Sequence, residues 1–256
     1  MVYARPGGLH WRWFGAALLA FGWLLAPASR LPQAAAQPTN VDLQLVLAVD
    51  ASGSVNQVRF ELQRAGYAAA FRDSDVIRAI RSGSTRSIAV TMTQWTGPSM
   101  NVVVVPWTLV KDQESAEALA RLIESAPRQL FGGGTSISGA IDFSVTQFPL
   151  SPWQGNRRVI DVSGDGANNR GRPSSAARDE AVAQNIVING LPILAIEADL
   201  EEHYRREVIG GPGAFLIAAQ NFETFAVAVR RKLVLEISAL PAPSGFAAVT
   251  NNRAPP

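Results

Sequence analysis

The sequence predicts an α/β domain with a doubly wound, mostly parallel sheet, one antiparallel edge strand, and helices on both faces. Strand-like apolar runs alternate with segments of helical periodicity along most of the chain, which is typical of a parallel sheet covered on both sides. Two of the predicted strands are joined by only a short turn, which favours an antiparallel pair. The 256 residues, 47% of them hydrophobic, suffice for one domain with a sizeable core.

The first strand is predicted at 42–49, where an apolar run contains no polar residue after Gln44. Such an uninterrupted run is typical of a parallel strand that is buried on both faces. The strand ends at the loop Asp50-Ala51-Ser52-Gly53-Ser54, where Gly53 permits a tight turn between two hydroxyls. A helix is predicted next, at roughly 55–80, with one apolar face formed by Val58, Leu62, Ala65 and Ala69.

The rest of the chain continues this alternation. Strands are predicted at 88–95 and 102–105 with a Gly97-Pro98 turn between them, and the glycines at 132–134 open a later helix. The remaining elements are predicted, in order, as helices around 116–126 and 137–148, a strand at 159–162, a helix at about 174–189, a strand at 193–196, a short helix at 201–209, a strand at 214–217 and a last helix at 221–238.

Three of the predicted loops carry oxygen-bearing side chains where a strand ends or a helix begins. Asp50, Ser52 and Ser54 lie in the first, Thr135 follows the glycines, and Asp165 follows the strand at 159–162. In a doubly wound sheet, ligands bind beyond the carboxyl ends of the strands, near the point where strand order reverses. Hard divalent cations, Mg²⁺ above all, prefer such oxygen ligands.

The three motifs resemble the metal-ion-dependent adhesion site (MIDAS) of the von Willebrand factor type A (vWA) domain family. They are Asp-x-Ser-x-Ser at 50–54, Gly-Gly-Thr at 133–135 and Asp-Gly at 165–166. The likeness covers roughly 40–238, and it is to bacterial exported members without an assigned function. One departure is Gly164, which makes the third loop Ser-Gly-Asp-Gly instead of the commoner Thr-Asp-Gly.

The resemblance implies how the five side chains would act. Ser52, Ser54 and at times Thr135 would bind Mg²⁺ or Mn²⁺ directly. Asp50 and Asp165 would act mostly through bound water, Asp165 at times directly. It also implies a protein partner, because an Asp or Glu of that partner would complete the coordination of the cation.

Each motif also has a purely structural interpretation, and two other functions stay open. Ser52, Ser54 and Thr135 could each cap a following helix, and Asp165-Gly166 could be only a turn. The alternatives to a binding module are a metal-assisted hydrolase that uses the same loops and a structural domain with a vestigial site. The hydrolase is disfavoured because the chain after residue 36 has a single histidine, His203, which we expect on a solvated helix face.

Three side chains outside the motifs could have either a functional or a purely structural role. Asp161 lies inside a strand pattern, so it either supports the site from behind or is exposed at a strand end. Trp95 and Trp107 lie near strand ends and could line a recognition surface, although we expect them to pack in the core.

The first 36 residues are typical of an export signal. A basic start is followed by an uncharged, mostly apolar run at 13–26, with cleavage predicted after Ala28 or Ala36. The run is too short to span a membrane readily, although an uncleaved anchor remains an alternative. We therefore expect a periplasmic or secreted vWA-like domain at 40–239, with no membrane span in the mature chain and a disordered tail at 240–256.

Composition excludes several other classes of function. There are no cysteines, so disulfides and thiolate metal sites are impossible. The predicted leader carries three arginines and no acidic residue, which leaves 20 Lys and Arg against 21 Asp and Glu in the mature chain. A protein with this balance has no general electrostatic attraction to nucleic acid, and no nucleic-acid partner is expected.

Overall fold

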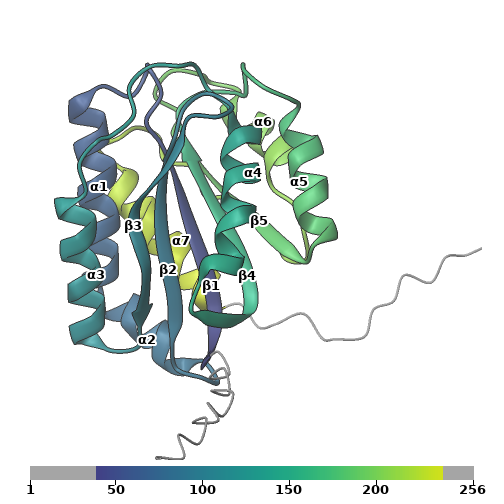
Figure 1. Cartoon of the computed structure of the whole chain (residues 1–256). Helices are drawn as coiled ribbons and strands as arrows, with labels where there is room; N and C mark the ends of the chain where they lie inside the picture. The colour runs from purple at the N-terminus through teal and green to yellow at the C-terminus, as the bar shows by residue number, and fades with distance from the viewer. Residues whose placement is uncertain (1–38, 239–256) are drawn as a thin grey trace, which may run out of the picture. The chain divides into compact units, whose positions relative to one another are not determined.

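The computed structural model describes residues 39–238, which form one five-stranded sheet between two layers of helices (Figure 1). The predicted export signal at 1–36 and the predicted tail at 240–256 lie outside the described residues. The sheet has the order β3-β2-β1-β4-β5, with the first strand in the centre. The strands are β1 (Thr39–Asp50), β2 (Ile88–Trp95), β3 (Asn101–Val110), β4 (Trp153–Gly164) and β5 (Ile186–Pro192).

The pairing of the strands confirms the predicted fold class. β1 is parallel to both β2 and β4, and β4 is parallel to β5. β3 lies at one edge and runs antiparallel to β2, as the short turn between them requires. Both faces of β1 are buried from Leu45 to Asp50, which explains its uninterrupted apolar sequence.

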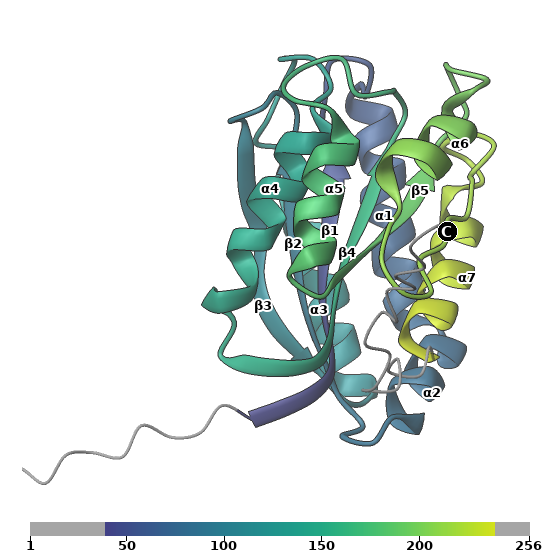
Figure 2. The same ribbon diagram turned by 90° about the vertical axis from the view of Figure 1, so that its right-hand side faces the viewer.

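The helices cover both faces of the sheet (Figure 2). One layer contains α1 (Gln57–Arg72), α2 (Ser74–Ser82), α3 (Gln113–Ser125) and α7 (Phe225–Ser238). The other contains α4 (Ile137–Gln147), α5 (Ser174–Ala183) and α6 (Leu200–His203), with a single 3₁₀ turn at Phe148–Leu150 and a π turn at Tyr204–Val208. The sheet thus separates two apolar clusters, and both of its faces are buried.

The predicted helix at 55–80 is in fact two helices with a break at Asp73. The backbone of Asp73 is extended, and its carboxylate accepts a hydrogen bond from Asp75 N at 2.8 Å, which caps α2. The predicted apolar face of α1 is also wrong, because Val58 is 64% exposed. The larger side chains Phe60, Tyr67 and Phe71 form the buried face instead.

The strand predicted at 193–196 lies too far along the chain. The preceding helix, α5, ends at Ala183, and Asn185 turns the chain in the left-handed region with φ of 58°. The β-branched run that starts at Ile186 then forms β5. The stretch predicted as a strand at 214–217 makes only an isolated bridge from Leu216 to Gly190, and α7 begins at Phe225 instead of residue 221.

The topology defines a switch point between β1 and β4. From β1 the chain builds β2 and β3 on one side of the sheet, and later builds β4 and β5 on the other. The loops that leave the carboxyl ends of β1 and β4 therefore diverge, and this is where doubly wound sheets bind ligands. Asp50 ends β1 and Gly164 ends β4, so two of the three motifs meet here.

Candidate metal centre

The carboxylate of Asp50 joins the loops that follow β1 and β4. Asp50 is fully buried, and its Oδ1 accepts a hydrogen bond from Ser52 N at 2.7 Å. Its Oδ2 lies 3.4 Å from Asp165 N, which donates to it. One buried side chain therefore fixes the backbone of both loops, although they are separated by more than a hundred residues in the sequence.

The side chains of Ser52, Ser54 and Asp165 are in direct contact. Ser54 Oγ donates to Asp165 Oδ1 at 2.5 Å, and Ser52 Oγ lies 3.2 Å from Ser54 Oγ. The other carboxylate oxygen, Asp165 Oδ2, is buried and has no hydrogen-bond donor within residues 39–238. Its nearest cationic group is Arg59 Nη1, at 3.6 Å.

Thr135 lies beside this cluster but makes no side-chain hydrogen bond to it. The three glycines before it all have positive φ, which only glycine adopts freely, and they bring the chain back toward the β4 loop. Thr135 N donates to Asn169 Oδ1 at 3.0 Å, and Asn169 N donates to Thr135 O at 2.9 Å. A methyl group placed on Gly166 would lie 3.6 Å from Thr135 Oγ1, so the hydroxyl faces the Asp165-Gly166 turn.

Packing explains why residue 164 is a glycine. A Cβ atom at this position would lie 2.9 Å from Asp50 Oδ2, 3.1 Å from Trp95 Cζ2 and 3.1 Å from Tyr204 Oη. These groups belong to fully buried residues, so none of them can move aside easily. The departure from the Thr-Asp-Gly pattern therefore makes room for the carboxylate of Asp50.

Burial makes both carboxylates costly to ionise. It raises the pKa of Asp50 from 3.8 to about 7, and the nearby charge of Asp165 adds to this rise. Burial also raises the pKa of Asp165, although the hydrogen bond from Ser54 opposes the shift. Two desolvated acids lie next to each other, with Arg59 paired to one of them, and such a pair is stabilised by a cation between or beside them.

The residues fit a hard divalent cation. Two carboxylates and up to three hydroxyls form a donor set made only of oxygen, which suits Mg²⁺ or Mn²⁺. Asp165 Oδ2, which is buried and has no hydrogen-bond donor within residues 39–238, is an atom that such an ion would satisfy. Within residues 39–238 there is no group of three or more His, Cys, Asp and Glu side chains placed to hold a metal, so this centre depends on its hydroxyl groups as well as on its two carboxylates.

Several supporting residues could not be recognised in the sequence. Arg128 Nη2 donates to Ala51 O at 2.9 Å, and Arg59 Nη1 donates to Ser54 O at 2.8 Å, so two arginines hold the first loop. The prediction that His203 lies on a solvated helix face is wrong. It is half-buried, and its Nε2 accepts a hydrogen bond from Asn168 N at 3.3 Å. Asn168 and Asn169, which follow the third motif after Ala167, are the nearest polar residues in the sequence, and the sequence alone assigns them no role.

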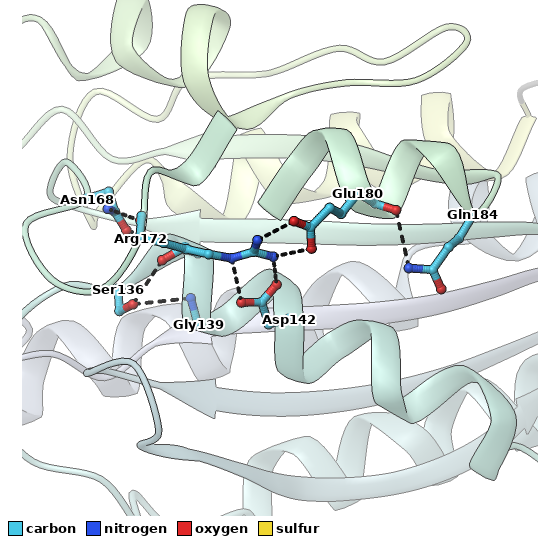
Figure 3. Close-up of polar contacts among 8 residues, drawn as sticks. Ser136, Gly139, Asp142, Asn168, Arg172, Glu180 and Gln184 are labelled. Atoms are coloured by element: carbon cyan, nitrogen blue, oxygen red, sulfur yellow. Dashed lines mark hydrogen bonds and ion pairs between the residues drawn. The ribbon is translucent and has the colours of Figure 1, made fainter. Parts of the chain in front are cut away.

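The loop after β4 is anchored to two helices by Arg172 (Figure 3). Its guanidinium forms paired contacts with Asp142 of α4, at 2.6 and 3.1 Å, and with Glu180 of α5, at 2.5 and 2.7 Å. Asn168 Nδ2 donates to Arg172 O at 3.0 Å, which closes the loop on itself. The segment from Asp165 to Arg172 is thus held at both ends.

The three side chains outside the motifs lie in or against the core, and Trp107 is the partly buried one, with its Nε1 donating to Gln147 O at 3.1 Å. Asp161 is fully buried in β4, where its Oδ1 lies 2.7 Å from Lys232 Nζ, so it is not exposed at a strand end. Trp95 is fully buried, as expected for core packing.

Comparison with known proteins identifies a sequence family and a fold. A family model described as "Protein of unknown function (DUF1194)" matches residues 40–241, more than half of the chain. No curated protein matches the sequence.

Solved structures with a similar fold include a von Willebrand factor type A protein from Catenulispora acidiphila, with 18% identity and a TM-score of 0.53, covering 77% of this chain and 43% of that one. Proximal thread matrix protein 1 from the mussel byssus, described with a zinc-occupied MIDAS motif, has 16% identity and a TM-score of 0.56, covering 78% and 48%. The pilus adhesin SpaC from Lactobacillus rhamnosus GG has 14% identity and a TM-score of 0.56, covering 77% and 31%. The chain spans less than half the length of these three structures, and identities this low establish only the shared fold.

Proposed function

The chain belongs to the DUF1194 family and has the von Willebrand factor type A fold, and from this premise we propose that it binds a partner protein through a divalent cation held by Asp50, Ser52, Ser54, Thr135 and Asp165. The observation that carries the proposal is the contact between Ser54 and Asp165 beside a buried carboxylate oxygen that has no hydrogen-bond donor within residues 39–238. Oxygen atoms from two distant loops converge there, and the one cation paired with them, Arg59 at 3.6 Å from Asp165 Oδ2, is a single charge beside two carboxylates.

The charge balance of the donors favours an acidic partner. When bound, a divalent cation supplies a positive centre that can accept one further oxygen ligand. Asp50 and Asp165 offset its charge, whereas the hydroxyls of Ser52, Ser54 and Thr135 add none. A carboxylate from an Asp or Glu of another protein is then the favoured additional ligand.

The descriptions of two similar structures agree with a metal-dependent binding function. One of them is described with zinc in its MIDAS motif, and another is a pilus adhesin. Both descriptions agree with a binding module more readily than with an enzyme. For this chain we propose Mg²⁺ or Mn²⁺, because every donor is a hard oxygen.

The proposal includes export of the domain at 40–239 to the periplasm or out of the cell. It rests on the basic start and apolar run of the first 36 residues. Within residues 39–238, no helix has the length and hydrophobicity needed to cross a membrane.

Thermal unfolding tests the metal site. A hundredfold excess of Mg²⁺ over its Kd should raise the melting temperature by roughly 5–10 °C relative to EDTA, because binding to the folded state alone adds about 2.7 kcal/mol. Asp50→Ala should lose this increase. The matched control is Asp179→Asn, which alters an exposed carboxylate on α5 whose ion-pair partner is Arg178 and which holds none of the site loops. Equal melting curves of the wild type in Mg²⁺ and EDTA would favour a structural domain.

Partner binding needs a separate test. Immobilised wild type is exposed to an extract of the native periplasm in Mg²⁺ and in EDTA, with Asp50→Ala in parallel. We expect a protein that is retained only by the wild type in Mg²⁺, and whose retention is lost when its own Asp or Glu at the contact is replaced. Turnover of ester or phosphate substrates that depends on Asp50 would instead identify a hydrolase.

A further inference from the structure

A groove of about 1230 Å³ lies at the end of the domain opposite the metal centre. It is lined by α2, by the turn before β2, by the junction of β3 and α3, and by the first residues of β1. β1 and β2 begin at this end and run toward the Asp50 loop, so the two sites lie at opposite ends of the sheet (Figure 1). Nothing in the proposed metal-dependent binding uses this groove.

The groove is strongly basic. Arg78, Arg81, Arg86 and Lys111 line it, all of them exposed, whereas Asp112 is the single acidic residue of its lining. Arg78 pairs with Asp75 at 2.8 Å. Within residues 39–238, no carboxylate lies within ion-pair distance of the other three cations.

Asp112 does not neutralise these cations by a direct contact. Its carboxylate caps α3, where it accepts hydrogen bonds from Ser115 N at 2.9 Å and Ser115 Oγ at 2.6 Å. These hydrogen bonds lower the pKa of Asp112, and the positive charges of Lys111 and Arg81 lower it further. Asp112 therefore stays ionised, and the lining keeps an excess of three positive charges.

The overall composition does not account for this excess. Of the 23 Lys and Arg, four (Arg5, Arg12, Arg30 and Arg253) lie outside the described residues, whereas all 21 Asp and Glu lie inside them. The described domain is thus slightly acidic, and a cluster of unpaired cations on it is a local feature.

The backbone of Arg86 is an additional sign of function. Its φ is 55°, in the left-handed region that glycine and asparagine adopt more readily than arginine. The turn before it is held by Asp42, which accepts hydrogen bonds from Ser84 Oγ at 2.7 Å and Thr85 N at 3.0 Å. The fold thus holds a long cationic side chain at a position where glycine or asparagine would be less strained.

We propose that this groove binds the phosphate groups of a ligand. Guanidinium groups match phosphate oxygens with paired hydrogen bonds, and three cations without partners suit an oxyanion that carries more than one charge. The hydroxyls of Ser74, Ser82 and Thr85 also line the groove and can donate to the same oxygens. The phosphate belongs either to a soluble ester or to the headgroup of an anionic lipid.

Two probes distinguish these sources, both used with EDTA so that phosphate does not act through bound metal. Pyrophosphate is titrated calorimetrically, and vesicles of phosphatidylcholine with and without phosphatidylglycerol are sedimented with the protein. We expect saturable binding of pyrophosphate if the ligand is soluble, and binding only to vesicles with phosphatidylglycerol if it is a lipid.

The matched variants are Arg81→Gln/Arg86→Asn and, as control, Arg231→Gln, which alters an exposed arginine on α7. Asparagine tolerates the left-handed backbone, so the double variant should keep its melting temperature while binding weakens by at least about tenfold. Lys111→Gln is a second variant that leaves the turn intact. Asp50→Ala should bind like the wild type. Failure of the wild type to bind either probe, or equal binding by wild type and double variant, would overturn the proposal.

Discussion

At the residue scale, burial raises the pKa of Asp161 to about 7, and the buried carboxylate of Asp50 makes a second contribution to the pH response of the metal-free domain. The pKa of Asp50 is about 7 in the folded state and 3.8 in its ordinary environment. An acid with a raised folded pKa takes up a proton on folding, so stability falls as pH rises from about 4 to about 7 and stays low above that. Once a cation binds beside the ionised carboxylate of Asp50, burial of that carboxylate no longer lowers the stability of the fold.

We therefore predict that Asp50→Asn has opposite effects with and without metal. In EDTA near pH 8 the variant should be more stable than the wild type, by on the order of 1–3 kcal/mol, because the ionised carboxylate is no longer buried. In Mg²⁺ the order should reverse. Urea unfolding between about pH 5 and pH 8 measures both effects. A variant that is less stable in EDTA at every pH would show that Asp50 is not a destabilised acid.

Gly164 provides a second residue-scale prediction. Gly164→Ala would place a methyl group within 3.1 Å of three buried groups, one of which is Asp50 Oδ2, so it should destabilise the domain by about 1–3 kcal/mol and weaken metal binding. Gly53→Ala is the control, since its nearest neighbour would be Gly132 Cα at an ordinary 3.7 Å. Unfolding in urea and Mg²⁺ titration of both variants test this. Equal tolerance of the two changes would contradict the packing argument.

At the scale of elements, a buried charged network fixes α7 to the sheet. Lys232 is fully buried, with its Nζ 2.7 Å from Asp161 of β4 and 3.1 Å from Glu236. Asn189 of β5 donates to Glu236 Oε1 at 2.7 Å, and Arg157 Nη2 donates to Glu236 O at 2.8 Å. The last helix is therefore attached to two strands by polar contacts as well as by its apolar side chains.

Replacing one member of this network should strongly destabilise the domain. Lys232→Met leaves Asp161 and Glu236 buried without their cation, so we expect a loss of about 3–5 kcal/mol in the free energy of unfolding. Arg231→Met, one position earlier and exposed, should change stability little. Adding Asp161→Asn to Lys232→Met should restore part of the loss, because one unpaired charge is then removed. Urea unfolding of the two single variants and the double variant measures these changes. A loss below about 1 kcal/mol for Lys232→Met would contradict the prediction that the network stabilises the fold.

At the scale of the whole molecule, the parts of the fold that depend on local pattern could be predicted. The apolar run before Asp50 and the short turn after Trp95 determined the central strand and the antiparallel edge. The break at Asp73 and the start of β5 could not be found in this way, since a capping carboxylate and a single left-handed residue decide them. Helical periodicity also predicted the wrong buried face of α1, because the large side chains of Phe60 and Tyr67 are buried in place of the smaller ones.

In the candidate site too, some residues could be predicted from local sequence patterns and others could not. The three motifs could be found because their spacing is local, and the fold brings Asp50, Ser52, Ser54 and Asp165 into contact. The residues that hold these loops, such as Arg128 and Asn169, were missed because their partners lie far away in the sequence. Nothing local marks an arginine whose role is to donate to the carbonyl of another loop.

The central claim is that side chains from three loops hold one divalent cation. Mn²⁺ binding followed by electron paramagnetic resonance tests it most directly, with Mg²⁺ as competitor. We predict one Mn²⁺ per chain in the wild type and in Asp179→Asn, displaced by Mg²⁺, and none in Ser54→Ala/Asp165→Asn. Equal Mn²⁺ binding by the wild type and the double variant, or no binding by the wild type, would contradict the assignment.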